Sequence, residues 1–190
     1  MLAEALSLDG PAMIRFPKTP APWREPGAPV GSGLEGRRTR SGDGSVCILA
    51  VGKLLAAAEE AADALISDGI DATVWDVRVV STPDPAMLAD AARHRVVVTA
   101  EDGIRQGGAG MFIGDALRSS CACGTAPPVV NLGIPRAYLP QGKPDRILAQ
   151  LDMLDDALFV DDKRRALRQL VARAANLLLA HRHTVLLQYL

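Results

Sequence analysis

The stretch from Val96 to Leu117, VVVTAEDGIRQGGAGMFIGDAL, joins an apolar run, an acidic pair, a glycine-rich turn and a helix-like segment. Such a turn can bind anions, because free backbone N–H groups point outward at a helix N-terminus. The glycines read G-x-G-x-x-x-G from Gly108, one residue longer than the dinucleotide-binding fingerprint, and the next expected strand ends in VVNLG without an acidic residue for a ribose. We therefore expect Gly107, Gly108 and Gly110 to let a helix start close against a strand or a neighbouring chain.

Other residues that could do chemistry are few. Glu101 and Asp102 stand at the carboxyl end of the apolar run, where α/β folds place their sites. Adjacent strand residues point to opposite faces, so only one of the two should face a cleft. His181 and His183 are two residues apart, which puts them on different sides of a helix, and we expect both at the surface. His94, at the start of a strand, has no assignable role.

The cysteines indicate no metal site. Cys47 lies in an apolar run and should be part of the core, whereas Cys121 and Cys123 form C-x-C without a second pair to complete a zinc site. Reduced thiols are typical of a cytoplasmic protein, and we expect that location.

The charge balance and composition exclude several function classes. The chain has 190 residues, 21 basic and 22 acidic, with a net charge of -1 and 4% aromatic residues. These values give no electrostatic or stacking argument for nucleic acid and none for an anionic membrane. The first residues lack the basic start and long apolar core of a secretory signal. We expect neither nucleic acid nor membrane as a partner.

Strand-like and helix-like segments alternate from Val46 onward. Short apolar strands alternating with amphipathic helices predict an α/β fold of three layers: a mainly parallel open sheet with helices on both faces. The strands are expected at 46–51, 70–80, 94–100 and 127–133, and the helices at 54–69, 84–93, 109–120 and 143–151.

The two ends of the chain differ from this pattern. Residues 17–45 are dense in Pro, Gly and Arg and are typical of an extended linker without a strand. Before them, PAMIRFP at 11–17 resembles one strand that follows a short helix. Residues 161–190 have apolar positions three and four apart, which predicts a long helix within a C-terminal segment, 156–190.

Four blocks, in order, carry a resemblance to a known family. The block VTAEDGIRQGGAGMFIGDAL resembles the V-T-x-E-[ED]-x-x-x-x-G-G-x-G segment of transketolase C-terminal domains. VVNLGIPRAYLPQGKPDRILAQLDML, GIDATVWDVRVVSTPDPAML and PAMIRFPK are similar to blocks of the 1-deoxy-D-xylulose-5-phosphate synthase family. The resemblance assigns 1–16 to the end of a pyrimidine-binding domain, 17–45 to a linker and 46–155 to a transketolase C-terminal-like domain.

The resemblance implies an activity that the chain would not perform alone. The family joins pyruvate to glyceraldehyde 3-phosphate, releases CO2 and forms 1-deoxy-D-xylulose 5-phosphate with thiamine diphosphate and Mg2+. Its cofactor motif and activating glutamate match nothing in these residues, and the Gly-Asp-Gly within SGDGS at 41–45 is interpreted as a turn. We expect a truncated, inactive C-terminal domain that binds no cofactor itself. The expected assembly is a homo-oligomer or a dimer with a fuller synthase chain.

Two arginines match family positions that face the substrate phosphate, Arg15 and Arg78. A guanidinium can pair two phosphate oxygens at once, which suits that role. The chain departs from the family at Ser81, which replaces a lysine, at Thr19, which replaces a glycine, and at Arg136, which replaces an aspartate. These departures count against a complete phosphate site.

Two other interpretations stay open. The chain is compatible with a non-catalytic partner or regulatory subunit of a thiamine-diphosphate enzyme, docked through its C-terminal helix and the glycine-rich helix start. It is also compatible with the C-terminal part of a 2-oxoacid dehydrogenase β subunit, although the LGIPRAYLPQG block counts against that branch.

Overall fold

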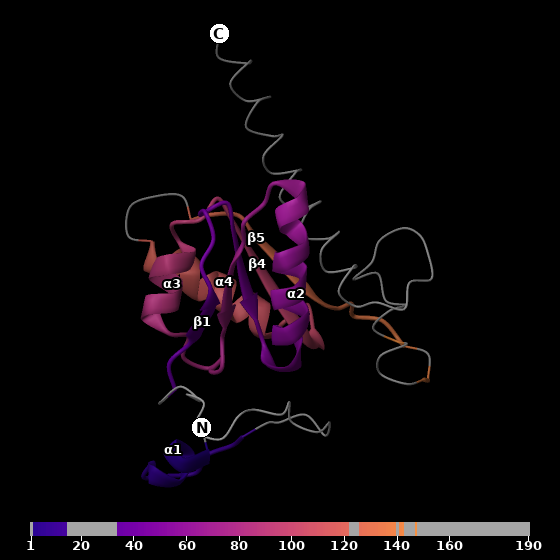
Figure 1. Cartoon of the computed structure of the whole chain (residues 1–190). Helices are drawn as coiled ribbons and strands as arrows, with labels where there is room; N and C mark the ends of the chain where they lie inside the picture. Colours follow the sequence, from indigo (N-terminus) through magenta and orange to yellow (C-terminus); the bar gives the residue numbers. More distant parts are fainter. Residues whose placement is uncertain (1, 15–33, 122–125, 140, 143–146, 148–190) are drawn as a thin grey trace, which may run out of the picture.

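The computed structural model describes residues 2–14, 34–121, 126–139, 141–142 and 147 (Figure 1). Its elements are listed here in chain order: α1 (Leu2–Ser7), β1 (Arg37–Arg40), β2 (Val46–Ala50), η1 (Gly52–Leu54), α2 (Leu55–Leu65), η2 (Ile66–Asp68), β3 (Thr73–Asp76), α3 (Pro85–Ala91), β4 (Val96–Ile104), α4 (Ala109–Ser120) and β5 (Val129–Ile134). The expected helices at 143–151 and 161–190 lie outside the described residues.

A five-stranded sheet forms the centre of the fold, in the order β1-β3-β2-β4-β5. The pairs β3–β2, β2–β4 and β4–β5 are parallel, so the carboxyl ends of four strands meet at one edge. Only the β1–β3 pair is antiparallel. The mainly parallel sheet expected from the sequence is therefore confirmed.

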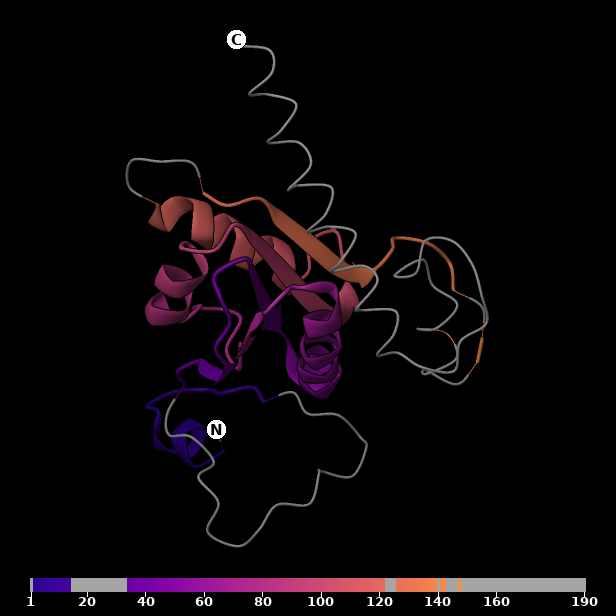
Figure 2. The same ribbon diagram turned by 45° about the horizontal axis from the view of Figure 1, so that its top comes forward.

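Helices cover both faces of this sheet, as expected. Alternate residues of the strands point to opposite faces, and each face has its own buried cluster. Ile48 and Val74 pack with the small side chains of α2, whereas Leu49 and Val97 pack with α3 and α4. Figure 2 shows α2 (purple) and the pair α3 and α4 (pink to orange) on opposite sides of the strands.

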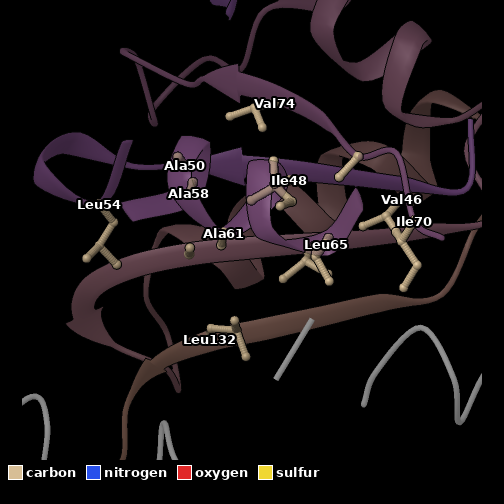
Figure 3. Close-up of a cluster of buried hydrophobic side chains, with 14 of the residues drawn as sticks. Val46, Ile48, Ala50, Leu54, Ala58, Ala61, Leu65, Ile70, Val74 and Leu132 are labelled. Atoms are coloured by element: carbon tan, nitrogen blue, oxygen red, sulfur yellow. The ribbon is translucent and has the colours of Figure 1, made fainter. Parts of the chain in front are cut away.

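The α2 face owes its close packing to alanine. Ala58, Ala61 and Ala62 are fully buried, and they let the helix approach the strands closely enough for Leu65 to reach the sheet (Figure 3). Gly69, at φ 75°, ends the segment by adopting the left-handed conformation. The helix expected over 54–69 is therefore confirmed in its position, as the α-helix α2 flanked by the short helices η1 and η2.

The start of α3 also follows its sequence signal. Asp84 is the N-cap, and its side chain accepts the backbone N–H of Ala86 at 2.7 Å, while Pro85 takes the first helical position. Asp84 accepts a second bond, at 2.8 Å, from the N–H of Gly36, which precedes β1. The cap thus also ties the start of β1 to α3.

The strand β1 corrects one expectation, because residues 17–45 were predicted to contain no strand. The four residues Arg37–Arg40 form the edge of the sheet. This strand has no pattern of apolar residues, and ion pairs hold it in place instead. Arg40 bonds to Asp63 and Asp71, and Arg38 lies 3.6 Å from Asp90. Hydrophobic periodicity cannot detect an edge strand that is fastened by charge.

Two further boundaries differ from the sequence-based prediction. The strand expected over 70–80 is limited to Thr73–Asp76, and the one expected over 94–100 continues to Ile104. The extension contains an irregularity between Ala100 and Ile104, after which Ile104 pairs with Ile134 of β5. At the N-terminus, residues 11–14 have no regular structure, and the rest of the strand expected over 11–17 lies outside the described residues.

Candidate functional site

The glycine-rich turn is a self-contained helix start. Glu101, with 4% of its surface exposed, accepts the backbone N–H groups of Ala109 at 3.0 Å and Gly110 at 2.8 Å. The next two N–H groups of α4, from Met111 and Phe112, bond to the carbonyl of Gly108. All four N–H groups at this helix start have partners inside the chain, so the turn offers none of them to a phosphate.

Close approach explains the glycines. A Cβ on Gly110 would lie 2.3 Å from the Oγ1 atom of Thr99, and one on Gly108 would lie 2.0 Å from the carbonyl oxygen of Ile104. Gly107 has φ 80°. The prediction that glycines let a helix start close against a strand is confirmed for Gly108 and Gly110, and the strand is β4, whereas Gly107 has open space and is required by its positive φ.

The acidic pair at the end of β4 divides as its alternation predicted. Glu101 points to α4, whereas the Oδ2 atom of Asp102 lies 3.0 Å from the Nζ atom of Lys53. Lys53 follows β2, so this ion pair joins two neighbouring carboxyl ends. Sequence reasoning missed Lys53, although a lysine three residues after a buried strand was a usable signal.

Arg78 lies just beyond the carboxyl end of β3, at φ 58°, and is the only non-glycine residue with positive φ in the described part of the chain. The N–H of Val79 donates to the carbonyl of Val77 at 2.6 Å, which closes a γ-turn around Arg78. The Nη1 atom of Arg78 donates to the carbonyl of Glu35 at 3.1 Å. Arg78 is thus held between the end of β3 and the segment that leads into β1.

Asp76, two residues earlier, is part of the same local structure. Its carboxyl accepts a backbone hydrogen bond from Arg78. Burial raises the pKa of Asp76 above its ordinary value, and the nearby charges of Arg37 and Arg78 offset this only in part, while Glu59 adds to it. An ionised Asp76 is therefore a partly desolvated charge that the fold tolerates beside two guanidinium groups.

The second arginine expected to face a phosphate, Arg15, lies outside the described residues. The structure therefore gives the surroundings of Arg78 alone. Ser81 is exposed on the segment after the γ-turn. Arg136 is exposed as well, and its N–H donates to the Oε1 atom of Gln106 at 3.2 Å.

The side chains of His94 and Cys47 belong to the scaffold. His94 is buried, with its Nδ1 atom 2.9 Å from the carbonyl of Asp90 and its Nε2 atom 2.9 Å from the Oγ1 of Thr73. Cys47 is buried in the core as expected, and burial raises the pKa of its thiol. His181, His183 and Cys123 lie outside the described residues.

The residues present do not fit a magnesium diphosphate. Asp43 of the SGDGS segment accepts the backbone N–H of Ser45 at 2.8 Å, and hydrogen bonding to Ser45, first from its side chain and then from its backbone, lowers the pKa of Asp43. A Cβ on Gly42 would lie 2.1 Å from the carbonyl oxygen of Asp71, so this glycine is required where the segment before β2 passes close to the backbone before β3. No group of three or more metal-binding side chains occurs in the ranges that the structure describes. No step that uses the cofactor is assigned to them.

In the same ranges, no helix has the length and apolarity to cross a bilayer.

Comparisons with known proteins agree with this architecture. The family model described as transketolase, C-terminal domain, matches residues 35–157. The 1-deoxy-D-xylulose-5-phosphate synthase of Thermobifida fusca is 37% identical over 179 residues, which cover 92% of this chain and 27% of that protein. The synthase of Chromobacterium violaceum is 36% identical over 155 residues, which cover 78% of this chain and 23% of that protein. The chain thus spans about a quarter of the length of these curated relatives.

One solved structure is also similar over most of the chain. It is described as a split gene transketolase, inactive beta4 tetramer, and it superposes with a TM-score of 0.74 at 26% identity, covering 92% of this chain and 53% of that one. The family match begins at residue 35, just before β1, and includes every strand of the sheet. This chain belongs to the transketolase C-terminal domain family, and the two relatives described above are 1-deoxy-D-xylulose-5-phosphate synthases.

Proposed function

We propose that this chain serves the 1-deoxy-D-xylulose-5-phosphate synthase reaction as the domain that binds the phosphate of glyceraldehyde 3-phosphate. Arg78 is the principal phosphate ligand, and Arg15 is the second. In this proposal, thiamine diphosphate and Mg2+ are held by the remaining parts of a fuller synthase. The chain alone would then bind phosphate without forming product.

The observation that carries this proposal is the strained γ-turn at Arg78. An L-residue with a bulky side chain is destabilised by about 1–2 kcal/mol in the left-handed region. Strained residues persist where the surrounding structure enforces them, and they cluster at functional sites. Arg78 also stands at the carboxyl edge of the parallel strands, where open α/β sheets bind their ligands.

A guanidinium at this edge has the chemistry that a phosphate monoester requires. Its planar fork donates two parallel N–H bonds to two phosphate oxygens. The bond from Arg78 to the Glu35 carbonyl uses its Nη1 atom, and it fixes the side chain against the segment that precedes β1. Orientation of the group before the substrate arrives lowers the entropic cost of binding.

The test is a chimera in which this chain replaces the matching C-terminal quarter of the Thermobifida fusca synthase. We expect the chimera to form 1-deoxy-D-xylulose 5-phosphate. Arg78→Gln should raise the KM for glyceraldehyde 3-phosphate by on the order of tenfold or more, with the KM for pyruvate unchanged.

The matched control is Arg95→Gln. Arg95 is exposed and precedes β4 at the opposite edge of the sheet, so its loss should leave both KM values unchanged. An Arg78→Gln chimera with an unaltered KM for glyceraldehyde 3-phosphate would refute the phosphate role.

A second function is favoured by the similarity to the split gene transketolase, whose beta4 tetramer is described as inactive. By analogy, this chain would be a non-catalytic subunit that pairs with a chain carrying the cofactor. Size-exclusion chromatography with light scattering, with and without a full-length synthase from the same cell, tests this. A mixed complex supports the subunit role, whereas separate elution of the two proteins contradicts it.

A further inference from the structure

Asp76 has an unusual combination of position and environment. It is the last residue of β3, and β1 places Arg37 directly opposite it in the antiparallel register. Directly opposite residues in neighbouring strands project from the same face, so Arg37 and Asp76 share the face that α2 covers. Glu59 of α2 adds a second negative charge near this carboxyl.

The contacts of Asp76 lead to Arg78. Its carboxyl accepts the backbone hydrogen bond from Arg78, inside the γ-turn that the Val79 N–H closes onto Val77. An aspartate that accepts a backbone N–H two residues further along the chain stabilises a turn. Here the turn is a strained one, and it places the Arg78 guanidinium against Glu35.

Ionisation of the same carboxyl opposes the stability of the fold. Burial is the largest influence on its pKa, and it raises that pKa despite the nearby arginines. For an acid whose pKa is raised on folding, the native state binds more protons than the unfolded state, so stability falls as the pH rises through that window. The ionised form of Asp76 is therefore less well stabilised in the fold than in water.

We propose that Asp76 is a positioning residue, whose carboxylate holds Arg78 in its left-handed conformation, with Arg37 on the edge strand keeping that carboxylate in place. The inference rests on the proposed phosphate role of Arg78, and it assigns a function to β1 as well. The edge strand is then part of the site, because it supplies Arg37, and the segment that leads into it supplies the Glu35 carbonyl.

The conformation of residue 78 is measured directly by NMR on the full chain. A positive φ shortens the distance between the N–H and Hα protons of the same residue, which gives a strong intraresidue cross-peak. Asp76→Ala removes the acceptor and should abolish this signature at Arg78. Asp76→Asn, which retains an acceptor oxygen, should restore it, and Asp63→Asn, which removes a carboxylate that pairs with Arg40 on the same edge, should leave it unchanged.

Ligand binding is measured on the same variants with sn-glycerol 3-phosphate as the probe. Asp76→Ala should weaken its affinity by on the order of tenfold, although the free energy of unfolding at neutral pH stays the same or rises. A residue with a merely structural role would show the reverse, a loss of stability together with any loss of affinity. Asp76→Asn should recover most of the affinity.

The outcomes separate the inference from the function on which it rests. If Arg78 keeps its positive φ in Asp76→Ala, the positioning role is wrong, whatever the probe does. If φ changes but the wild-type chain does not bind the probe, the phosphate role of Arg78 is wrong and the conformational role of Asp76 stands. If φ and affinity are lost together and Asp76→Asn restores both, the inference is supported.

Discussion

The buried carboxylate of Glu101 accepts the backbone N–H of Gly110 at 2.8 Å, nine residues further along the chain. The other carboxylate oxygen takes the N–H of Ala109, so a side chain from the end of β4 occupies the position where an external anion would bind α4. This contact turns a sequence that resembles a phosphate-binding turn into an internal anchor between strand and helix.

Loss of this anchor should be costly. Glu101→Ala leaves the N–H groups of Ala109 and Gly110 without an acceptor, and we expect the free energy of unfolding to fall by about 3 kcal/mol. Asp115→Ala is the control, because Asp115 lies on the same helix with its side chain 76% exposed and should change stability by less than about 0.5 kcal/mol. Urea unfolding measures both variants. Equal losses in the free energy of unfolding for the two variants would show that the Glu101 hydrogen bonds do not stabilise the helix start.

Two glycines of α4 offer a matched pair for the close approach to β4. In Gly110→Ala the new Cβ would meet Thr99 Oγ1 at 2.3 Å, and we expect a loss of about 2 kcal/mol. In Gly114→Ala the nearest atom is 3.6 Å away, so the better helix propensity of alanine should raise stability by up to about 1 kcal/mol. Thermal unfolding of the two variants should therefore shift in opposite directions. A gain in stability for Gly110→Ala would contradict the packing described.

The sequence predicted those parts of the fold whose signals are local. The apolar strand that becomes β2, the Asp84–Pro85 start of α3 and the glycine-rich start of α4 each have a pattern that acts over a few residues. The edge strand β1 has no such pattern, because its arginines are held by acidic residues that lie 23 to 52 positions away in the chain, such as Asp63 and Asp90. Only the folded chain brings those partners together.

At the candidate site, too, the sequence shows the local features but not the contacts between distant segments. The position of Arg78 after a strand is visible in the sequence, but its γ-turn is not, because nothing in the letters VRVV requires a positive φ. The ion pair between Lys53 and Asp102 depends on β2 and β4 being neighbours in the sheet, which chain order alone does not establish. Contacts between segments that are distant in sequence therefore decide which charged residues meet at the carboxyl edge.

A buried aspartate should make the stability depend on pH. Burial raises the pKa of Asp90, but the hydrogen bonds from Arg93 and Trp75, with further help from the charges of His94 and Arg38, lower it below the ordinary 3.8 overall. Because the folded pKa is the lower one, the stabilisation is present above pH 3.8 and is lost as the pH falls through the folded pKa. Asp90→Asn should be less stable than wild type at about pH 6. The difference in the free energy of unfolding between the two proteins should shrink as the pH falls from about 6 toward the folded pKa of Asp90.

Trp75 provides the probe for that measurement, since its Nε1 atom donates to Asp90 at 2.8 Å. Its fluorescence and the urea midpoint can be followed together from about pH 6 to about pH 3. Asp115→Asn, at an exposed position on α4, should show the same pH dependence as wild type. A stability gap between wild type and Asp90→Asn that does not change with pH would contradict the lowered pKa.

The ion pair at the carboxyl edge should be worth more than its exposed counterpart on α4. Lys53 and Asp102 lie 3.0 Å apart with side chains 30% and 25% exposed, whereas Arg118 and Asp115 lie 3.4 Å apart with side chains 61% and 76% exposed. Partial burial reduces screening by water, so a double-mutant cycle with Lys53→Met and Asp102→Asn should give a coupling of about 1 kcal/mol. The cycle with Arg118→Met and Asp115→Asn should give a coupling energy near zero.

Repeating both cycles in about 1 M salt should lower the coupling energy of the Lys53–Asp102 pair only modestly, because salt screens exposed charges most strongly. Equal coupling in the two cycles would mean that this contact does not hold the ends of β2 and β4 together.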